Sequence, residues 1–226
     1  MSHEADAQRA HDPGKSNADT GHIDLLRRAL ARPLPGLAAQ LHMAPAYRAE
    51  ALQNRAPPEN PRQAAVLVLL YARAGELLFP LTRRTDTVEN HKGQISLPGG
   101  AREGTETLQH TALRETCEEL ATCYDELTPI GSLSPLYVPP SGFLIHPFVA
   151  YADMRPGFKP DPVEVAELIE VPLSNLLDPR TEAQEEWVIS GSPVKVPFYH
   201  IFGHKVWGAT AMVLAELVAI LREVQI

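Results

Sequence analysis

The segment from residue 93 to residue 121 constrains the fold of this chain more than any other. It reads as a short strand, a glycine turn, an acidic loop and then a helix. In that helix Glu115, Glu118 and Glu119 are spaced i, i+3 and i+4, so their carboxylates share one face. These like charges repel one another, and a divalent cation with a preference for oxygen ligands would convert the repulsion into attraction. The segment therefore predicts a Mg²⁺ or Mn²⁺ site for phosphate-ester or pyrophosphate chemistry.

The same acidic triplet also has a simpler interpretation, a solvated helix face. The opposite face carries Leu113, Thr116, Cys117 and Leu120, which can pack against a sheet in either case. The residues around the triplet decide between the two interpretations.

Charged residues and a glycine surround the triplet at fixed spacing: Gly100, five residues, Glu106, seven residues, Arg114-Glu115, two residues, Glu118-Glu119. The arrangement resembles the Nudix box, G-x5-E-x7-R-E-U-x-E-E-x-G-U, at every charged position and at the first glycine. Ala121 stands at the second glycine and Thr122 at the last apolar position. The resemblance implies an α/β (α+β) fold, the Nudix α/β/α sandwich with a mixed sheet. It also implies hydrolysis of a nucleoside diphosphate linked to another group, X.

Length, charge and cysteine content limit the remaining possibilities. A chain of 226 residues with 44% hydrophobic residues can form one domain with an extension. No apolar run approaches the roughly 18 residues of a membrane span. The net charge of −8 argues against nonspecific nucleic-acid binding. The resemblance to the Nudix box implies instead a nucleotide-containing small molecule as the partner. Cys117 and Cys123 lack C-x-x-C spacing and no signal peptide is evident, which predicts two reduced thiols and a cytoplasmic protein.

Three regions are expected along the chain. Residues 1–20 are polar and predict a disordered tail. Residues 21–61 show a helical pattern at 23–30 and a short helix or turn at 37–43, followed by a proline-rich linker. Residues 62–226 should form the Nudix domain.

Within that domain the hydrophobic patterns predict alternating strands and helices. Strands are expected at 63–71, 76–82, 94–97, 127–138 and 142–152, with a late hairpin of 186–189 and 195–200. Residues 163–170 lead into a short helix at 174–177. A long amphipathic helix at 207–224 should be mainly core, and part of it could also serve a homodimer interface.

A second resemblance covers most of residues 63–224. Residues 81–84 (L-T-R-R) and 91–100 (H-K-G-Q-I-S-L-P-G-G) are similar to the L-T-x-R…G-x-x-x-F-P-G-G signature of coenzyme A pyrophosphatases. The late stretch 197–211 is also similar to that family.

Three positions depart from this signature. Thr85 stands where Ser or Ala is usual, Glu89 where Arg is usual, and Leu97 where Phe is usual. Glu89 matters most, because an arginine could meet a substrate phosphate and a carboxylate would repel one.

The metal ligands are expected on the acidic helix and the glycine turn. Glu115 and Glu119 are the expected ligands because residues i and i+4 stack most directly. Glu118 is expected as a third, partly through water, and a carbonyl of Gly100 or Gly99 would complete the shell.

The other box residues have catalytic or structural roles. Arg114 is expected to orient the carboxylates by pairing with Glu106, which is close to a purely structural ion pair. The general base stays open among Glu115, Glu118 and an acid from a later loop. Glu164 is the candidate for that acid, and its alternative is a surface or strand-end residue.

Candidate substrate contacts lie on both sides of the glycine turn. Arg84 and Lys92 are either phosphate contacts or ordinary solvated charges, and the backbone at Gly99 can approach a substrate closely. Tyr137 and Phe143 either stack on a base or pantetheine arm or belong to the core.

Three functions fit these residues. The first is a Mg²⁺-dependent pyrophosphatase that cleaves coenzyme A or its derivatives to 3′,5′-ADP and 4′-phosphopantetheine. The second is the same chemistry on ADP-ribose, a nucleotide sugar or a nucleoside triphosphate, which Glu89 favours. The third is a non-catalytic ligand-binding module, which the intact R-E-x-x-E-E pattern argues against.

Overall fold

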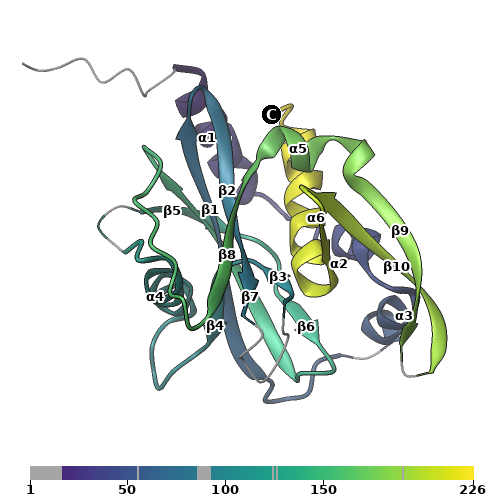
Figure 1. Ribbon diagram of the computed structural model, residues 1–226. Coiled ribbons are helices and arrows are strands. Elements are labelled where there is room, and N and C mark those ends of the chain that lie inside the picture. Colours follow the sequence, from purple (N-terminus) through teal and green to yellow (C-terminus); the bar gives the residue numbers. More distant parts are fainter. Residues whose placement is uncertain (1–16, 55, 86–92, 124, 126, 190) are drawn as a thin grey trace, which may run out of the picture.

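The fold is a mixed sheet with helices on both faces (Figure 1). The computed structural model describes residues 17–54, 56–85, 93–123, 125, 127–189 and 191–226. The larger sheet contains β1 (Arg62–Arg73), β2 (Glu76–Arg84), β3 (Ile95–Ser96), β4 (Gly99–Ala101), β5 (Thr128–Ser132), β6 (Leu136–Val138), β7 (Phe143–Ala152) and β8 (Val165–Pro172). The smaller sheet contains β9 (Glu182–Ile189), β10 (Ser192–Ile201) and β11 (His204–Trp207). The helices are α1 (Asn17–Leu30), α2 (Leu37–Gln40), α3 (Ala46–Asn54), α4 (Leu108–Leu120), α5 (Leu173–Leu177) and α6 (Gly208–Glu223), with 3₁₀ turns at Leu41–Met43 and Pro179–Thr181.

Strand β1 is the centre of the larger sheet, whose main path runs β3-β2-β1-β7-β5. It pairs in parallel with β7 and antiparallel with β2 and β4. Its side chains alternate between two cores: Leu67 and Leu69 belong to the cluster under α4, and Val68 and Leu70 to the cluster with α1 and α6. Because both faces are covered, β1 reads as a continuous apolar run. The α/β/α sandwich predicted from the sequence is therefore confirmed.

Most predicted elements are present, and four were missed: helix α3 and the strands β4, β8 and β11, of which β8 was expected only to lead into a short helix. The first hairpin (β1 and β2) and the late one (β9 and β10) are both observed. The predicted strand at 127–138 is two shorter strands, β5 and β6. The missed strands β4 and β11 have three and four residues, too few to show a period. Helix α3 precedes the proline-rich stretch, and the sequence predicted only a linker for this whole region.

A buried carboxylate fastens the N-terminal extension to the last helix. Glu216 of α6 is fully buried and accepts three hydrogen bonds of 3.0 Å each, from the backbone N–H of Gly36, the side-chain amide of Gln40 and the backbone N–H of Ser134. The extension is therefore held against α6 and the β5–β6 loop by paired polar groups.

The last helix is core, as predicted. Its large apolar residues are buried, namely Met212, Val213, Leu214, Leu217, Val218, Ile220 and Leu221. These residues belong to the core cluster that includes side chains of α1 and β1. None of the described helices is both long and apolar enough to cross a bilayer.

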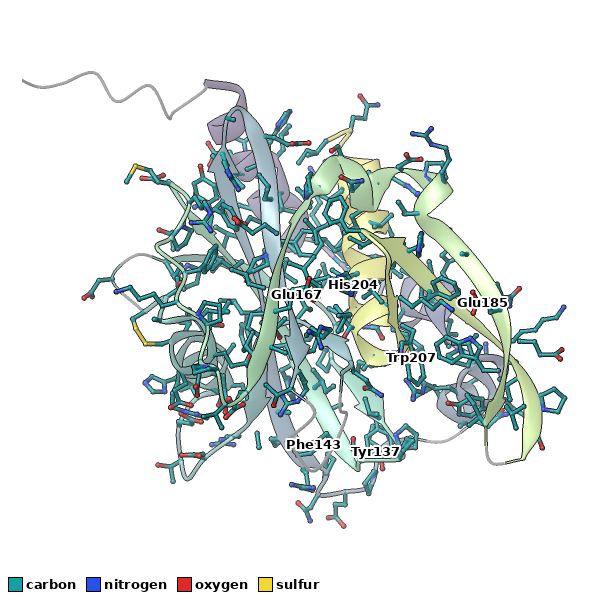
Figure 2. All side chains as sticks on the ribbon, viewed as in Figure 1. Tyr137, Phe143, Glu167, Glu185, His204 and Trp207 are labelled. Atoms are coloured by element: carbon teal, nitrogen blue, oxygen red, sulfur yellow. A yellow bond between two sulfur atoms is a disulfide. The ribbon has the colours of Figure 1, made fainter. Side chains whose placement is uncertain are left out.

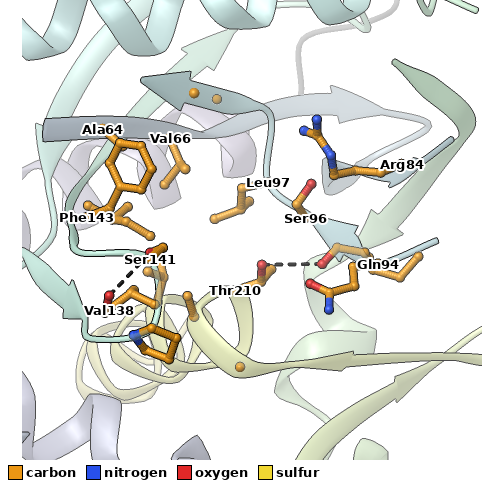
Figure 3. A pocket seen from close by; sticks show the side chains of 18 of the residues that line it. Ala64, Val66, Arg84, Gln94, Ser96, Leu97, Val138, Ser141, Phe143 and Thr210 are labelled. Atoms are coloured by element: carbon orange, nitrogen blue, oxygen red, sulfur yellow. Dashed lines mark hydrogen bonds between the residues drawn. The ribbon is translucent and has the colours of Figure 1, made fainter. Parts of the chain in front are cut away.

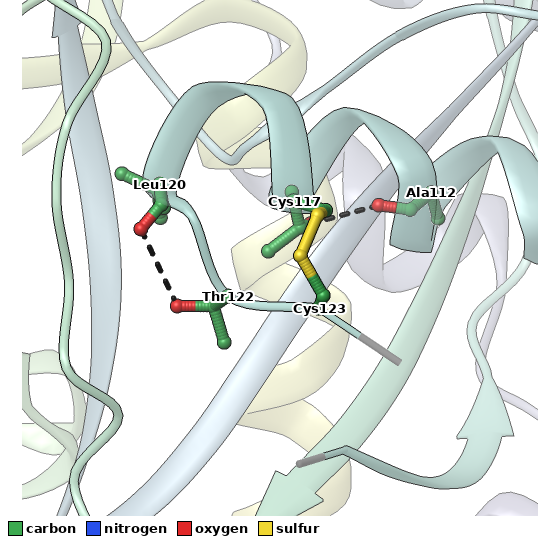
Figure 4. The surroundings of a disulfide bond; sticks show 6 residues. Ala112, Cys117, Leu120, Thr122 and Cys123 are labelled. Carbon is green, nitrogen blue, oxygen red and sulfur yellow. Dashed lines mark hydrogen bonds between the residues drawn. A yellow bond between two sulfur atoms is a disulfide. The ribbon is translucent and has the colours of Figure 1, made fainter. Parts of the chain in front are cut away.

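The two cysteines correct one prediction. The sequence predicted reduced thiols, but Cys117 of α4 and Cys123, just beyond the helix end, form a disulfide (Figure 4). Their Cα atoms are 4.5 Å apart, within the range that a disulfide spans. The left-handed residue Ala121 reverses the chain between them, so a spacing that is not C-x-x-C still brings the sulfur atoms together.

We predict that Glu216→Leu lowers the free energy of unfolding by about 3–5 kcal/mol, because it leaves three buried donors without an acceptor. Urea unfolding at constant pH measures this. Glu223→Gln, at an exposed position near the end of the same helix, is the matched control. A loss below about 1 kcal/mol for Glu216→Leu would contradict this account of the extension.

Ala121 also generates a prediction, because it ends α4 at φ 54°, a left-handed conformation that suits glycine. We expect Ala121→Gly to raise the free energy of unfolding by about 1 kcal/mol. Ala38→Gly, inside α2 and exposed, should instead lower it by up to about 1 kcal/mol. Two changes of the same sign would refute the assignment of a strained helix cap.

Candidate active site

The site is built where the glycine turn meets α4. The short strand β4 pairs with β1, and Gly99 adopts φ 149° with its α-carbon against the carbonyl of Ala65. Any side chain at Gly99 would collide with that carbonyl. A Cβ at Gly100 would lie 2.5 Å from the carboxylate of Glu115. Gly99 therefore lets the turn lie against β1, and Gly100 leaves the space that the carboxylate of Glu115 occupies.

Two carboxylates of α4 lie beneath this turn. Glu119 is 4% exposed and accepts a hydrogen bond of 3.4 Å from the N–H of Gly99. Burial raises the pKa of Glu119 to about 8; the N–H of Gly99 and the charge of Arg84 oppose the rise, and the charges of Glu115 and Glu164 add to it. Burial also raises the pKa of Glu115, against the opposing effect of its neighbour Arg114. Burial thus disfavours the ionised form of both carboxyls, and the neighbouring arginines only partly offset this effect.

Arg114 holds the remaining acidic groups of the box. Its guanidinium binds Glu106 through two hydrogen bonds of 3.2 and 3.0 Å, and also lies 2.9 Å from oxygens of both Glu115 and Glu118. The hydrogen bonds from Arg114 hold the pKa of Glu106 well below its usual range. Glu118 remains 59% exposed at the side chain, so it lies at the rim while Glu115 and Glu119 are inside.

Glu164, in the loop before β8, lies near the carboxylates of α4 although it is far from them in the sequence. Its carboxylate lies 3.9 Å from the guanidinium of Arg84 at the end of β2. Thr85 fixes the loop: its hydroxyl donates to the carbonyl of Val163 at 2.7 Å and its N–H to the carbonyl of Glu164 at 3.0 Å. The structure therefore brings the candidate acid and a candidate phosphate contact to the carboxylates of α4.

A cavity of about 850 Å³ opens beside the glycine turn (Figure 3). Gly99, Gly100 and Arg84 line it on one side and the first residues of α6 on another. Its volume falls in the range of small-molecule and cofactor sites. Phe143 also lines it, with the guanidinium of Arg62 over the ring at 4.0 Å from the centroid.

Other predicted residues are placed differently. Tyr137 is half-buried on β6, next to Val138, which pairs with Phe143 of β7 (Figure 2). Unlike Phe143, Tyr137 does not line the cavity. Lys92, as well as Glu89, lies outside the described residues.

Two cavity residues were missed from the sequence. Arg48 of α3 and Arg62 of β1 both line the cavity. Neither belongs to a recognisable spacing, because one comes from the extension and the other from the first residue of a strand. The only available signal was their positive charge in an acidic chain, which does not mark a position.

The donor set fits a divalent cation. Among the described residues no three His, Cys, Asp or Glu side chains already converge as a metal cluster. Nevertheless, Glu115 and Glu119 supply hard oxygen ligands with raised pKa values, and the missing side chain of Gly100 lets the carboxylate of Glu115 lie against the glycine turn. In this arrangement Glu118 is held by Arg114 and would have to turn inward to become a third ligand.

We expect binding of Mn²⁺ to the protein to strengthen as pH rises toward about 8. Below that pH the carboxyl of Glu119 holds a proton that the cation must displace, so affinity should rise by up to about tenfold per pH unit from about pH 6. Calorimetry or the electron paramagnetic resonance of Mn²⁺ measures this without any substrate. Glu119→Gln should weaken binding and flatten the slope, whereas an equal slope in both proteins would contradict the role of Glu119.

Comparison with known proteins agrees with this geometry. A model of the NUDIX domain matches residues 61–189. The uncharacterized Nudix hydrolase NudL of Photorhabdus laumondii is 33% identical over 171 residues, covering 74% of this chain and 90% of that protein. Human mitochondrial coenzyme A diphosphatase NUDT8 is 33% identical over 159 residues, covering 68% of this chain and 67% of that protein.

Solved structures add support for the fold alone. The crystal structure of RenU, a Nudix hydrolase from M. smegmatis, matches with a TM-score of 0.50 at 20% identity, covering 73% of this chain and 86% of that one. The domain match and the two relatives assign the chain to a family, whereas the structural likeness shows only its fold. The chain therefore belongs to the Nudix hydrolase family, whose members are pyrophosphohydrolases.

Proposed function

We propose that the protein hydrolyses the diphosphate bond of coenzyme A or its derivatives, with Mg²⁺ as cofactor, to give 3′,5′-ADP and 4′-phosphopantetheine. One observation carries the proposal: two inward carboxylates, Glu115 and Glu119, lie beside a glycine turn that lines a large cavity containing arginine side chains. The acidic side suits a divalent cation, and the arginines suit the phosphates of a nucleotide substrate. The name of the human relative, a coenzyme A diphosphatase, supports the choice of substrate.

The proposed reaction is a displacement at phosphorus. Water forms a new P–O bond, the bond from that phosphorus to the bridging oxygen breaks, and the bridging oxygen leaves with the other phosphate. A carboxylate accepts the proton of the water. Nudix hydrolases generally use divalent metals, and a bound cation would supply charge neutralisation at the phosphate oxygens.

Phosphate binding, proton acceptance and orientation of the carboxylates are assigned to different residues of the chain. Arg84 is a candidate phosphate contact, because it lines the cavity at the edge of the carboxylate cluster. Glu164 is our proposed general base, since its charge already acts on Glu115 and Glu119. Glu115 and Glu118 remain the alternatives. Arg114 orients the carboxylates of Glu106, Glu115 and Glu118 by direct contact and does not need to touch the substrate.

The second candidate function is the same chemistry on ADP-ribose, a nucleotide sugar or a nucleoside triphosphate. Glu89 is the observation that favours it, because a carboxylate replaces the arginine of the coenzyme A signature. The non-catalytic alternative is disfavoured by the intact set of box carboxylates.

Mg²⁺ or Mn²⁺ as the cation, a homodimer and a cytoplasmic location also belong to this proposal. The location rested partly on reduced cysteines, and the disulfide between Cys117 and Cys123 removes that support. A thiol titration of the purified protein under denaturing conditions, with and without reductant, tests whether Cys117 and Cys123 are paired. Two free thiols in the absence of reductant would show that the cysteines are reduced and would again support a cytoplasmic location.

A hydrolysis panel tests the substrate. Coenzyme A, acetyl-coenzyme A, ADP-ribose, UDP-glucose and nucleoside triphosphates are each incubated with Mg²⁺ or Mn²⁺, and the products are identified by mass. Release of 3′,5′-ADP from coenzyme A is the expected result. Turnover of the other nucleotides alone would transfer the assignment to the second candidate.

We predict that Glu119→Gln lowers kcat for the best substrate by about 10²–10⁴, because it removes an inward carboxylate from the site. Glu164→Gln should cause a loss in the same range if Glu164 is the base, and should leave Mn²⁺ affinity nearly unchanged. Glu223→Gln is the control and should keep full activity. Full activity of Glu119→Gln would overturn the assignment of the site.

A further inference from the structure

The N-terminus of α6 opens on the same cavity without a side-chain cap. Gly208, Ala209 and Thr210 begin the 16-residue helix and all line the cavity. Trp207, in the capping position, is extended and makes no capping hydrogen bond through its side chain. The hydroxyl of Thr210 donates instead to the carbonyl of Ile95 at 3.4 Å (Figure 3). The first turn therefore presents free backbone N–H groups and the positive end of the helix dipole.

Arg48 of α3 lies at this helix end. It is only 8% exposed, and its buried Nε has no hydrogen-bond partner among the described residues. Its Nη1 lies 3.5 Å from the position that a Cβ on Gly208 would take, and the residue lines the cavity. No described ion pair neutralises it. A nearly buried guanidinium is thus aimed at the positive end of a helix.

Such an arrangement is unfavourable in the absence of a negative group. A charged side chain loses hydration on burial, and an adjacent positive helix end adds repulsion. An anion between the two would convert both effects into attraction and satisfy the free donors. The clamp formed by Glu216 with Gly36 and Gln40 holds the preceding segment of the extension in place, so α3 is presented to the cavity by a fixed scaffold.

We propose that Arg48 and the first turn of α6 form a second anion-binding subsite of the cavity, for a phosphate group that is not part of the cleaved diphosphate. This inference rests on the proposed function and narrows its substrate class: the preferred substrate carries a phosphate beyond the diphosphate. The 3′-phosphate of a 3′-phosphoadenosine group meets that requirement, whereas ADP-ribose and UDP-glucose have no such group.

Nucleotide binding tests the subsite independently of catalysis. Calorimetry in the absence of metal compares 3′,5′-ADP with 5′-AMP, which differ by the 3′-phosphate alone. The wild-type protein should bind 3′,5′-ADP at least about tenfold more tightly, as charge-assisted hydrogen bonds to one phosphate allow. Equal affinities for the two nucleotides would overturn the proposal without any variant.

The variant Arg48→Met, of similar length but uncharged, should reduce that ratio to about threefold or less. Its melting temperature should equal or exceed that of the wild type, because it removes an unpaired buried charge. Arg28→Met, at an exposed position of α1 in the same extension, is the matched control and should keep the full ratio. An unchanged ratio in Arg48→Met, or a large fall in melting temperature with loss of both nucleotides, would show that Arg48 is merely structural.

Turnover separates this proposal from the proposed function. Comparison of coenzyme A with dephospho-coenzyme A should show a higher kcat/KM for coenzyme A, and Arg48→Met should reduce the difference. A protein that prefers 3′,5′-ADP but cleaves neither compound keeps the subsite and loses the proposed function. A protein that cleaves both compounds equally and binds both nucleotides equally keeps the function and loses the subsite.

Discussion

The close approach of a glycine backbone to a helix carboxylate is the constraint on which the site depends. Gly99 lies against the carbonyl of Ala65, and the missing Cβ of Gly100 leaves the space beside the carboxylate of Glu115. The helix can take this position because its apolar face packs on one side of β1. The core of the sandwich and the chemistry of the site are therefore fixed by the same contact between β4, β1 and α4.

One arginine then divides the acidic residues of the helix into different environments. Arg114 pairs with Glu106 and Glu118, which keeps Glu118 at the rim, and it only partly offsets the burial of Glu115. Glu119 lies deeper, and its pKa rises accordingly. Chemically identical side chains thus acquire distinct protonation behaviour from their surroundings.

The N-terminal extension contributes to the cavity as well as to the fold. Glu216 holds it through three buried hydrogen bonds. Arg48 follows on α3 and reaches the first turn of α6, which lies about 160 residues further along the chain. A segment outside the matched NUDIX region, residues 61–189, therefore supplies part of the cavity wall.

The sequence by itself determined the features that depend on local spacing. The box residues lie within one turn and one helix, so their common face and the sandwich around β1 could be predicted from period and motif. Tertiary structure alone decided which carboxylates are buried, how Glu164 and Arg84 reach them, and that Arg48 enters the cavity. It also decided the pairing of Cys117 with Cys123, which depends on the left-handed turn at Ala121. Burial and long-range contacts arise from packing between segments far apart in the chain, and no local pattern encodes that packing.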